Sequence, residues 1–159
     1  MTTATNQPPV RGRYFEEFNV GLKVTTPART ITETDIVNFA AFSADWNQIH
    51  TDAEFCKSTM FGQRVAHGLL ILSIASGLIT RLGVIEGTVD AFRELRWKFS
   101  LPVFIGDTVH VTATVIETRP MRRLGNGMVV LEVAVINQRG EVVQKGPWQA
   151  LVRCRPDAE

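Results

Sequence analysis

Hydrophobic residues change their spacing from helical to strand-like along this chain, and the first clear pattern is helical. Ile36, Phe39 and Ala40 recur at intervals of three and four residues, which predicts an amphipathic helix. Thr32-Glu33-Thr34-Asp35 directly precedes them and has the composition of a capping box, in which the side chains of the first and fourth residues satisfy free backbone N–H groups. We therefore expect a capped helix that ends near Ser43.

Two more helices are predicted after this one. Thr51-Asp52-Ala53-Glu54 is a second capping box, and it predicts a helix through about Thr59. From His67-Gly68 to about Leu82 runs a helix that is apolar almost all round. A helix without a solvated face must be buried on most sides, so we expect other elements to wrap it.

The later part of the chain supplies the wrapping elements, because its hydrophobic residues alternate with polar ones. Val109, Val111, Ala113 and Val115 alternate with His110, Thr112 and Thr114, which is the period of a strand with one buried face. Gly125-Asn126-Gly127 and Gln138-Arg139-Gly140 provide turns for hairpins. Strands are predicted at about Leu22 to Ile31, Ala91 to Phe99, Thr108 to Thr118, Met128 to Ile136 and Val142 to Val152. The fold class predicted is α+β, with a curved antiparallel sheet around one long central helix.

Length and composition fit one domain. The 159 residues suffice for a substantial core. Residues 1–13 are polar, contain Pro8-Pro9 and predict a flexible tail, which leaves 14–155 as the domain. The tail has no apolar run resembling a signal peptide. The longest apolar segment, Leu69 to Leu82, is interrupted by polar residues and is shorter than the roughly 20 residues that cross a membrane.

Charge and cysteine content narrow the partners further. A net charge of +1 gives no electrostatic basis for binding nucleic acid or an anionic membrane. Cys56 and Cys154 cannot form a disulfide framework, so we expect a cytoplasmic protein. Neither cysteine has a Cys or His neighbour at metal-ligand spacing, so we expect both to be packing residues and expect no metal.

The most informative polar residues are Asp45 and His50, which lie five positions apart in the link between the first two helices. A carboxylate and an imidazole held by two capped helices can converge on one small volume, as acid–base catalysis requires. The alternative is that they are ordinary loop residues, since loops are rich in Asp and His. Trp46 lies between them and is placed to contact a bound substrate.

The long apolar helix begins with a second candidate, His67-Gly68. The first turn of a helix has unpaired N–H groups and the positive end of the helix dipole, so it can hold a developing oxyanion. Gly68 would let a carbonyl oxygen approach the backbone closely, or it could serve only for tight packing. Further along, a small polar stripe could hydrogen-bond to the Asp45–His50 link, or its hydroxyls could bond to carbonyls one turn earlier; it comprises Ser73, Ser76, Gly77 and Thr80.

These motifs together resemble a known family. Ala44-Asp45-Trp46-Asn47-Gln48-Ile49-His50 resembles the hydratase signature Gly-Asp-x-Asn-Pro-x-His. Phe61 to Gly68 and Leu101 to Asp107 also match the family in type, order and spacing, and the similarity extends from about Phe15 to Val152. The chain is thus similar to the MaoC-like dehydratases, which include the (R)-specific enoyl-CoA hydratases. It departs from the signature at Ala44 and Gln48, where the family has glycine and proline.

The resemblance implies a hot-dog fold and a homodimer or higher homo-oligomer. It also implies reversible hydration of trans-2-enoyl-CoA to (R)-3-hydroxyacyl-CoA, with an acyl-CoA thioester as substrate and no separate cofactor. Asp45 and His50 would hold the catalytic water, the Gly68 amide would bind the thioester oxygen, and Ser76 would support Asp45. Further supporting or substrate-positioning residues would be Asn47, Trp46 and His67. A hot-dog acyl-CoA thioesterase and a non-catalytic hot-dog partner subunit are the alternatives.

Overall fold

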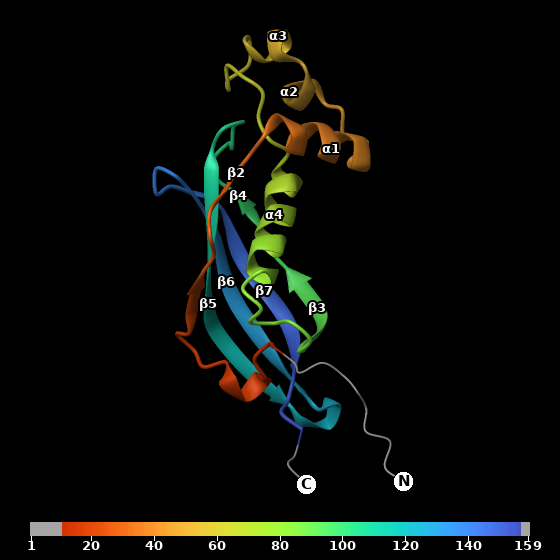
Figure 1. Cartoon of the computed structure of the whole chain (residues 1–159), viewed down its shortest axis with the longest axis vertical. Helices are drawn as coiled ribbons and strands as arrows, with labels where there is room; N and C mark the ends of the chain where they lie inside the picture. The colour runs from red at the N-terminus through yellow and green to blue at the C-terminus, as the bar shows by residue number, and fades with distance from the viewer. Residues whose placement is uncertain (1–10, 157–159) are drawn as a thin grey trace.

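A seven-stranded antiparallel sheet curves around helix α4 in the computed structural model, which describes residues 11–156 (Figure 1). The helices are α1 (Glu33–Ser43), α2 (Gln48–Thr51), α3 (Ala53–Cys56) and α4 (Gly68–Thr80), with short 3₁₀ turns η1 (Phe15–Glu17) and η2 (Arg122–Leu124). The strands are β1 (Lys23–Thr25), β2 (Arg29–Thr30), β3 (Val89–Leu95), β4 (Lys98–Phe99), β5 (Thr108–Met121), β6 (Asn126–Asn137) and β7 (Val142–Arg153). The predicted α+β class and the sheet around one long helix are confirmed.

The sheet is built on the three long strands, β5, β6 and β7. Its order is β1-β5-β6-β7-β3, while β2 also pairs with β5 and β4 also pairs with β7. Val109, Val111, Ala113 and Val115 are buried on β5, as their alternation predicts. Figure 1 shows α1, α2 and α3 gathered at one end of the molecule, close to the end at which α4 begins.

Helix α4 buries one face and exposes another, so it is less enclosed than its composition predicts. Its buried residues pack against the valines of the sheet; they are Leu70, Ile71, Ile74, Ala75, Leu78 and Ile79. The small polar stripe lies on the exposed side. Ser73 donates to the Leu69 carbonyl and Thr80 to the Ser76 carbonyl, so these two hydroxyls bond to the preceding turn of their own helix.

Two of the predicted strands are interrupted. The strand expected from Leu22 to Ile31 is divided into β1 and β2 around Pro27, which has no N–H to donate to a ladder. The strand expected from Ala91 to Phe99 is divided into β3 and β4. At this break the carbonyl of Arg96 lies so close to Gly146 of β7 that a Cβ there would be 2.0 Å from the oxygen.

The caps of the short helices also need correction. Thr32 caps α1 with Asp35 as its reciprocal partner, as predicted. The second helix, however, is capped by Asp52, whose side chain accepts from the Phe55 N–H, and not by Thr51. Thr51 instead ends α2, a separate turn, and α3 ends at Cys56.

The predicted tail lies mostly outside the described residues, which begin at Arg11. Gly12 and Arg13 do not behave as a tail, because their backbone N–H groups donate to the carbonyls of Glu86 and Val84. Within residues 11–156, no helix is both long enough and apolar enough to cross a membrane.

Candidate functional site

A sharp turn after α1 brings Asp45 to the surface of the site. Ala44 ends α1 in the left-handed conformation, with φ of 59°. The Asp45 side chain is half-exposed, and its Oδ1 accepts from the Asn47 backbone N–H at 3.3 Å. Asn47 also caps α2, since its side-chain oxygen accepts from the Ile49 N–H. The link is therefore held by hydrogen bonds of its own residues.

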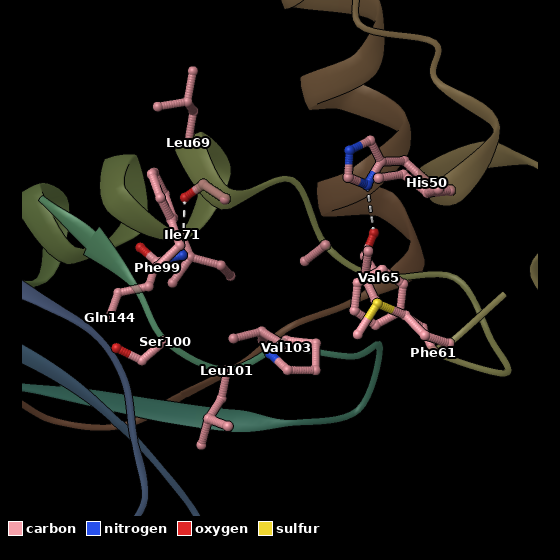
Figure 2. Close-up of a pocket in the computed structure, with 15 residues that line it drawn as sticks. His50, Phe61, Val65, Leu69, Ile71, Phe99, Ser100, Leu101, Val103 and Gln144 are labelled. Atoms are coloured by element: carbon pink, nitrogen blue, oxygen red, sulfur yellow. Dashed lines mark hydrogen bonds between the residues drawn. The ribbon is translucent and has the colours of Figure 1, made fainter.

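His50 lies on α2 and is buried beside this carboxylate. Its Nδ1 is 2.7 Å from the Val65 carbonyl oxygen, which can only accept, so Nδ1 carries the proton (Figure 2). In the neutral ring Nε2 then has a free lone pair. Nε2 is 4.0 Å from Asp45 Oδ2, so the two potential proton acceptors face one small space.

The surroundings of His50 favour its neutral form. Burial lowers the pKa of His50, and the nearby His67 ring also lowers it. The hydrogen bond to the Val65 carbonyl and the charge of Asp45 oppose this effect without reversing it. At neutral pH the site therefore contains a neutral imidazole next to Asp45.

His67 is a buried support for both residues. Its ring stacks on His50 with 3.8 Å between centroids, and its Nε2 is 2.9 Å from the Asp45 carbonyl oxygen. Its Nδ1 is buried without a hydrogen-bond partner among the described residues. His67 thus connects the start of α4 to the backbone of Asp45.

Gly68 follows as the first residue of α4 and borders a cavity. A Cβ at this position would lie 2.7 Å from Cε1 of Phe99, so any larger residue would force the Phe99 ring to shift. The N–H groups of this first turn have no intrahelical acceptor, as at every helix start. Both readings of Gly68, close packing and an exposed amide, are therefore compatible with the structure.

The cavity has a volume of about 550 Å³ and mostly apolar walls. His50 lies at one side of it and Gln144 at the other (Figure 2). The third family motif forms the wall between them through Leu101, Pro102 and Val103. This wall is fixed to the second motif because the Ala66 N–H donates to the Val103 carbonyl at 2.8 Å. The remaining lining residues are Ile49, Met60, Phe61, Val65, Ala66, Gly68, Leu69, Ile71, Phe99 and Ser100.

The structure brings Asp45, His50, His67 and Gly68 to one end of α4, where His50 and Gly68 line the cavity and Asp45 and His67 do not. Trp46 is 56% exposed and does not line the cavity. Ser76 is exposed two turns into α4, about 12 Å along the helix from Gly68. No hydrogen bond within residues 11–156 joins Ser76 to Asp45, so the support expected from Ser76 stays a prediction.

Gln144 is a buried polar lining residue that the sequence did not predict. It is 3% exposed, and it follows Val143 in the predicted last strand. A buried amide in an apolar strand needs hydrogen-bond partners, and this is the signal that could have marked it.

Asp45, His50 and His67 also offer three ligand atoms within 4.8 Å of one another. A regular metal site requires the lone pairs of its ligands to converge on one point. The planes of the two stacked rings differ by only 27°, so their in-plane lone pairs do not converge on one ion. The geometry fits a site for a water molecule and an organic substrate better than a metal centre.

Comparison with known proteins agrees with this geometry. Residues 17–137 match the MaoC-like domain. The (R)-specific enoyl-CoA hydratase of Rhodospirillum rubrum is 34% identical over 143 residues, which cover 89% of this chain and 93% of the relative. Protein MaoC of Klebsiella aerogenes is 40% identical over 102 residues, but these span only 30% of that longer protein.

Solved structures give the same result. A monoamine oxidase regulatory protein from Archaeoglobus fulgius superposes with a TM-score of 0.85 at 41% identity, covering 91% of this chain and 97% of the other. RV0216 of Mycobacterium tuberculosis, described as a double hot-dog fold, superposes with a TM-score of 0.81 at 21% identity and covers 96% of this chain and 47% of the other. The fold is therefore a hot-dog fold. The chain belongs to the MaoC-like dehydratase family, and its relatives include an (R)-specific enoyl-CoA hydratase and a 3-hydroxybutyryl-CoA dehydratase.

Proposed function

We propose that this protein is a hydro-lyase that reversibly hydrates trans-2-enoyl-CoA thioesters to (R)-3-hydroxyacyl-CoA. One observation carries the proposal. His50 Nε2 and Asp45 Oδ2 lie 4.0 Å apart, next to an apolar cavity at the start of α4. Two acceptors at this separation suit one water molecule that donates a hydrogen bond of ordinary length to each. Its lone pair is then free to attack an alkene carbon lying in the cavity.

The reaction balances with the groups present. The water oxygen forms a bond to C3, the C2=C3 π bond breaks, and its electrons move toward C2 and the thioester oxygen. Asp45 takes a proton from the water, and His50 delivers a proton to C2. Because the pKa of His50 is lowered, its ring starts neutral, so Asp45 passes the water's proton to His50 Nε2 before that nitrogen delivers it to C2. The pair ends each turnover in the state in which it began.

Negative charge that develops on the thioester oxygen needs stabilisation. The Gly68 N–H at the start of α4 is suited to this task, because it lies at the positive end of the helix dipole and at the cavity wall. Removing one such donor typically costs roughly 100- to 1000-fold in rate. Coenzyme A serves as the handle of the substrate, and no other cofactor takes part in these steps.

The first test replaces Asp45 and His50. Asp45→Asn and His50→Gln keep the size of each side chain while removing its proton chemistry, so each should lower kcat for hydration by roughly 100-fold or more. KM should change much less. The double variant should be little worse than either single variant, because groups that act as a unit are not additive. Asp52→Asn is the matched control, since Asn caps a helix as well as Asp does.

The outcome separates this proposal from the alternatives. Full hydratase activity in Asp45→Asn would contradict the mechanism. Thiol release from saturated acyl-CoA would indicate a thioesterase, and no turnover of the wild-type protein with a broad enoyl-CoA panel would indicate a non-catalytic subunit.

The stereochemistry rests on the relatives, one of which is the (R)-specific hydratase of Rhodospirillum rubrum. We expect the product to be inert toward an (S)-specific 3-hydroxyacyl-CoA dehydrogenase. Prompt NAD reduction in that coupled assay would show that the product is the (S) isomer.

A further inference from the structure

Gln144 of β7 is a buried amide to which the chemistry above gives no role. Its Nε2 donates to the Gly68 carbonyl oxygen at 3.1 Å, although the two residues are 76 positions apart. Its Oε1 accepts from the Trp97 indole N–H at 2.8 Å. Because an indole N–H can only donate, Trp97 fixes which end of the carboxamide faces Gly68.

The surrounding strands explain why these groups meet. Phe99 of β4 lies directly opposite Gln144 of β7, so both side chains point toward the same face of the sheet. Gly68 packs on this pair, against the Phe99 ring on one side and the Gln144 amide on the other. The first turn of α4 is thus attached to the sheet at Gly68, the residue whose amide is proposed to bind the thioester oxygen.

We propose that Gln144 is a positioning residue for the oxyanion site. It holds the first peptide groups of α4 in place through its hydrogen bond to the Gly68 carbonyl. The inference rests on the hydratase function proposed above. A hydrogen bond to the carbonyl of Gly68 limits rotation of the peptide that follows this residue and so restrains its backbone. The N–H groups of Gly68 and Leu69 then keep one direction relative to the cavity. A displacement of about 1 Å at such a site can cost up to roughly 100-fold in rate.

The effect should appear in turnover and not in binding, because the hydrogen bond is made to the backbone of the enzyme. Gln144→Leu removes both hydrogen bonds at nearly the same size. We expect kcat to fall by roughly 10- to 100-fold while KM changes by less than about threefold. Trp97→Phe removes only the bond that orients the amide, so it should give a smaller loss of kcat in the same direction.

A pH-dependent rescue separates positioning from general support of the fold. Gln144→Glu leaves an acceptor for Trp97, but its carboxylate repels the Gly68 carbonyl. Once protonated, it can donate to that carbonyl as Gln144 does. Burial raises the pKa of such a carboxyl, so the activity of the variant relative to wild type should rise as the pH falls.

Asn137 provides a matched control, since it is a buried amide at the end of β6, hydrogen-bonded to Glu141. Asn137→Leu should lower the thermal midpoint without changing kcat. If Gln144→Leu keeps wild-type kcat, or if its loss merely follows its thermal midpoint and Gln144→Glu shows no pH-dependent rescue, the positioning role is wrong. If the wild-type protein itself fails to hydrate enoyl-CoA, the proposed function is wrong instead.

Discussion

At the scale of single residues, His50 should control the response of the enzyme to pH. Its folded-state pKa lies below the ordinary value of 6.5, chiefly because the ring is buried. In the proposed mechanism the neutral ring receives the water's proton through Asp45, so kcat/KM should hold near pH 6.5. It should then fall by about tenfold per pH unit below the lowered pKa, as for a single titrating group.

The lowered pKa of His50 should also make the stability of the folded protein depend on pH. In the unfolded chain His50 binds a proton once the pH falls below about 6.5, whereas the folded protein resists protonation until its lower pKa. The contribution of the neutral His50 ring to the free energy of unfolding is therefore complete above pH 6.5, and it is lost as the pH falls through the folded-state pKa. The thermal midpoint should drop less steeply on acidification in His50→Gln than in the wild type. Equal slopes for His50→Gln and the wild type would contradict this assignment.

At the scale of secondary-structure elements, the end of α1 carries a strained residue. Ala44 is the only residue other than glycine with positive φ among residues 11–156. An L-residue in the left-handed region costs about 1 kcal/mol or more, and glycine avoids this cost. The family signature has glycine here, so Ala44→Gly should stabilise the protein by about 1 kcal/mol and raise its midpoint by roughly 2–4 °C.

The control for this prediction is the same change one turn earlier. Ala41 is an exposed residue inside α1, where glycine costs about 1 kcal/mol relative to alanine. Calorimetry should therefore give shifts of opposite sign for Ala44→Gly and Ala41→Gly. A loss of stability in both variants would show that Ala44 is not strained.

The elements also show what the sequence could predict. Periodicity placed α1, α4 and the alternating strand β5 because each follows one simple repeat. It placed the second cap at Thr51, whereas the Phe55 N–H bonds to Asp52, because both residues are acceptable caps and only the path of the chain decides between them. Similarly, the break between β3 and β4 depends on the close contact of Arg96 with Gly146, which is a property of two strands together.

The candidate site likewise contains residues that local sequence patterns predict and residues that depend on contacts between distant parts of the chain. Asp45, His50 and Gly68 were predicted as site residues from a local motif and a helix start, each of which consists of residues close together in the sequence. Gln144 reaches Gly68 across 76 positions, and its role depends on the register of β4 and β7. Long-range partners of this kind become visible only once the strands are paired.

At the scale of the whole molecule, strand β3 is left at the edge of the sheet. It pairs with β7 along one side, and no partner strand lies along its other side within residues 11–156. Its side chains include Phe92, which is 51% exposed, and Leu95, which is 39% exposed. An uncovered apolar edge is a ready pairing site for a second chain, and closed two-fold dimers are the commonest outcome.

We therefore expect at least a homodimer that pairs through β3. Light scattering at micromolar concentration should give a mass of twice the 17.7 kDa chain or a higher multiple. Phe92→Lys places a charge on the edge strand, so it should weaken self-association by roughly tenfold or more. Val20→Lys is the matched control, because Val20 is 64% exposed in the turn before β1 and should leave the mass unchanged. A fully active wild-type monomer at that concentration would refute the dimer, whereas a dimer unaffected by Phe92→Lys would place the interface elsewhere.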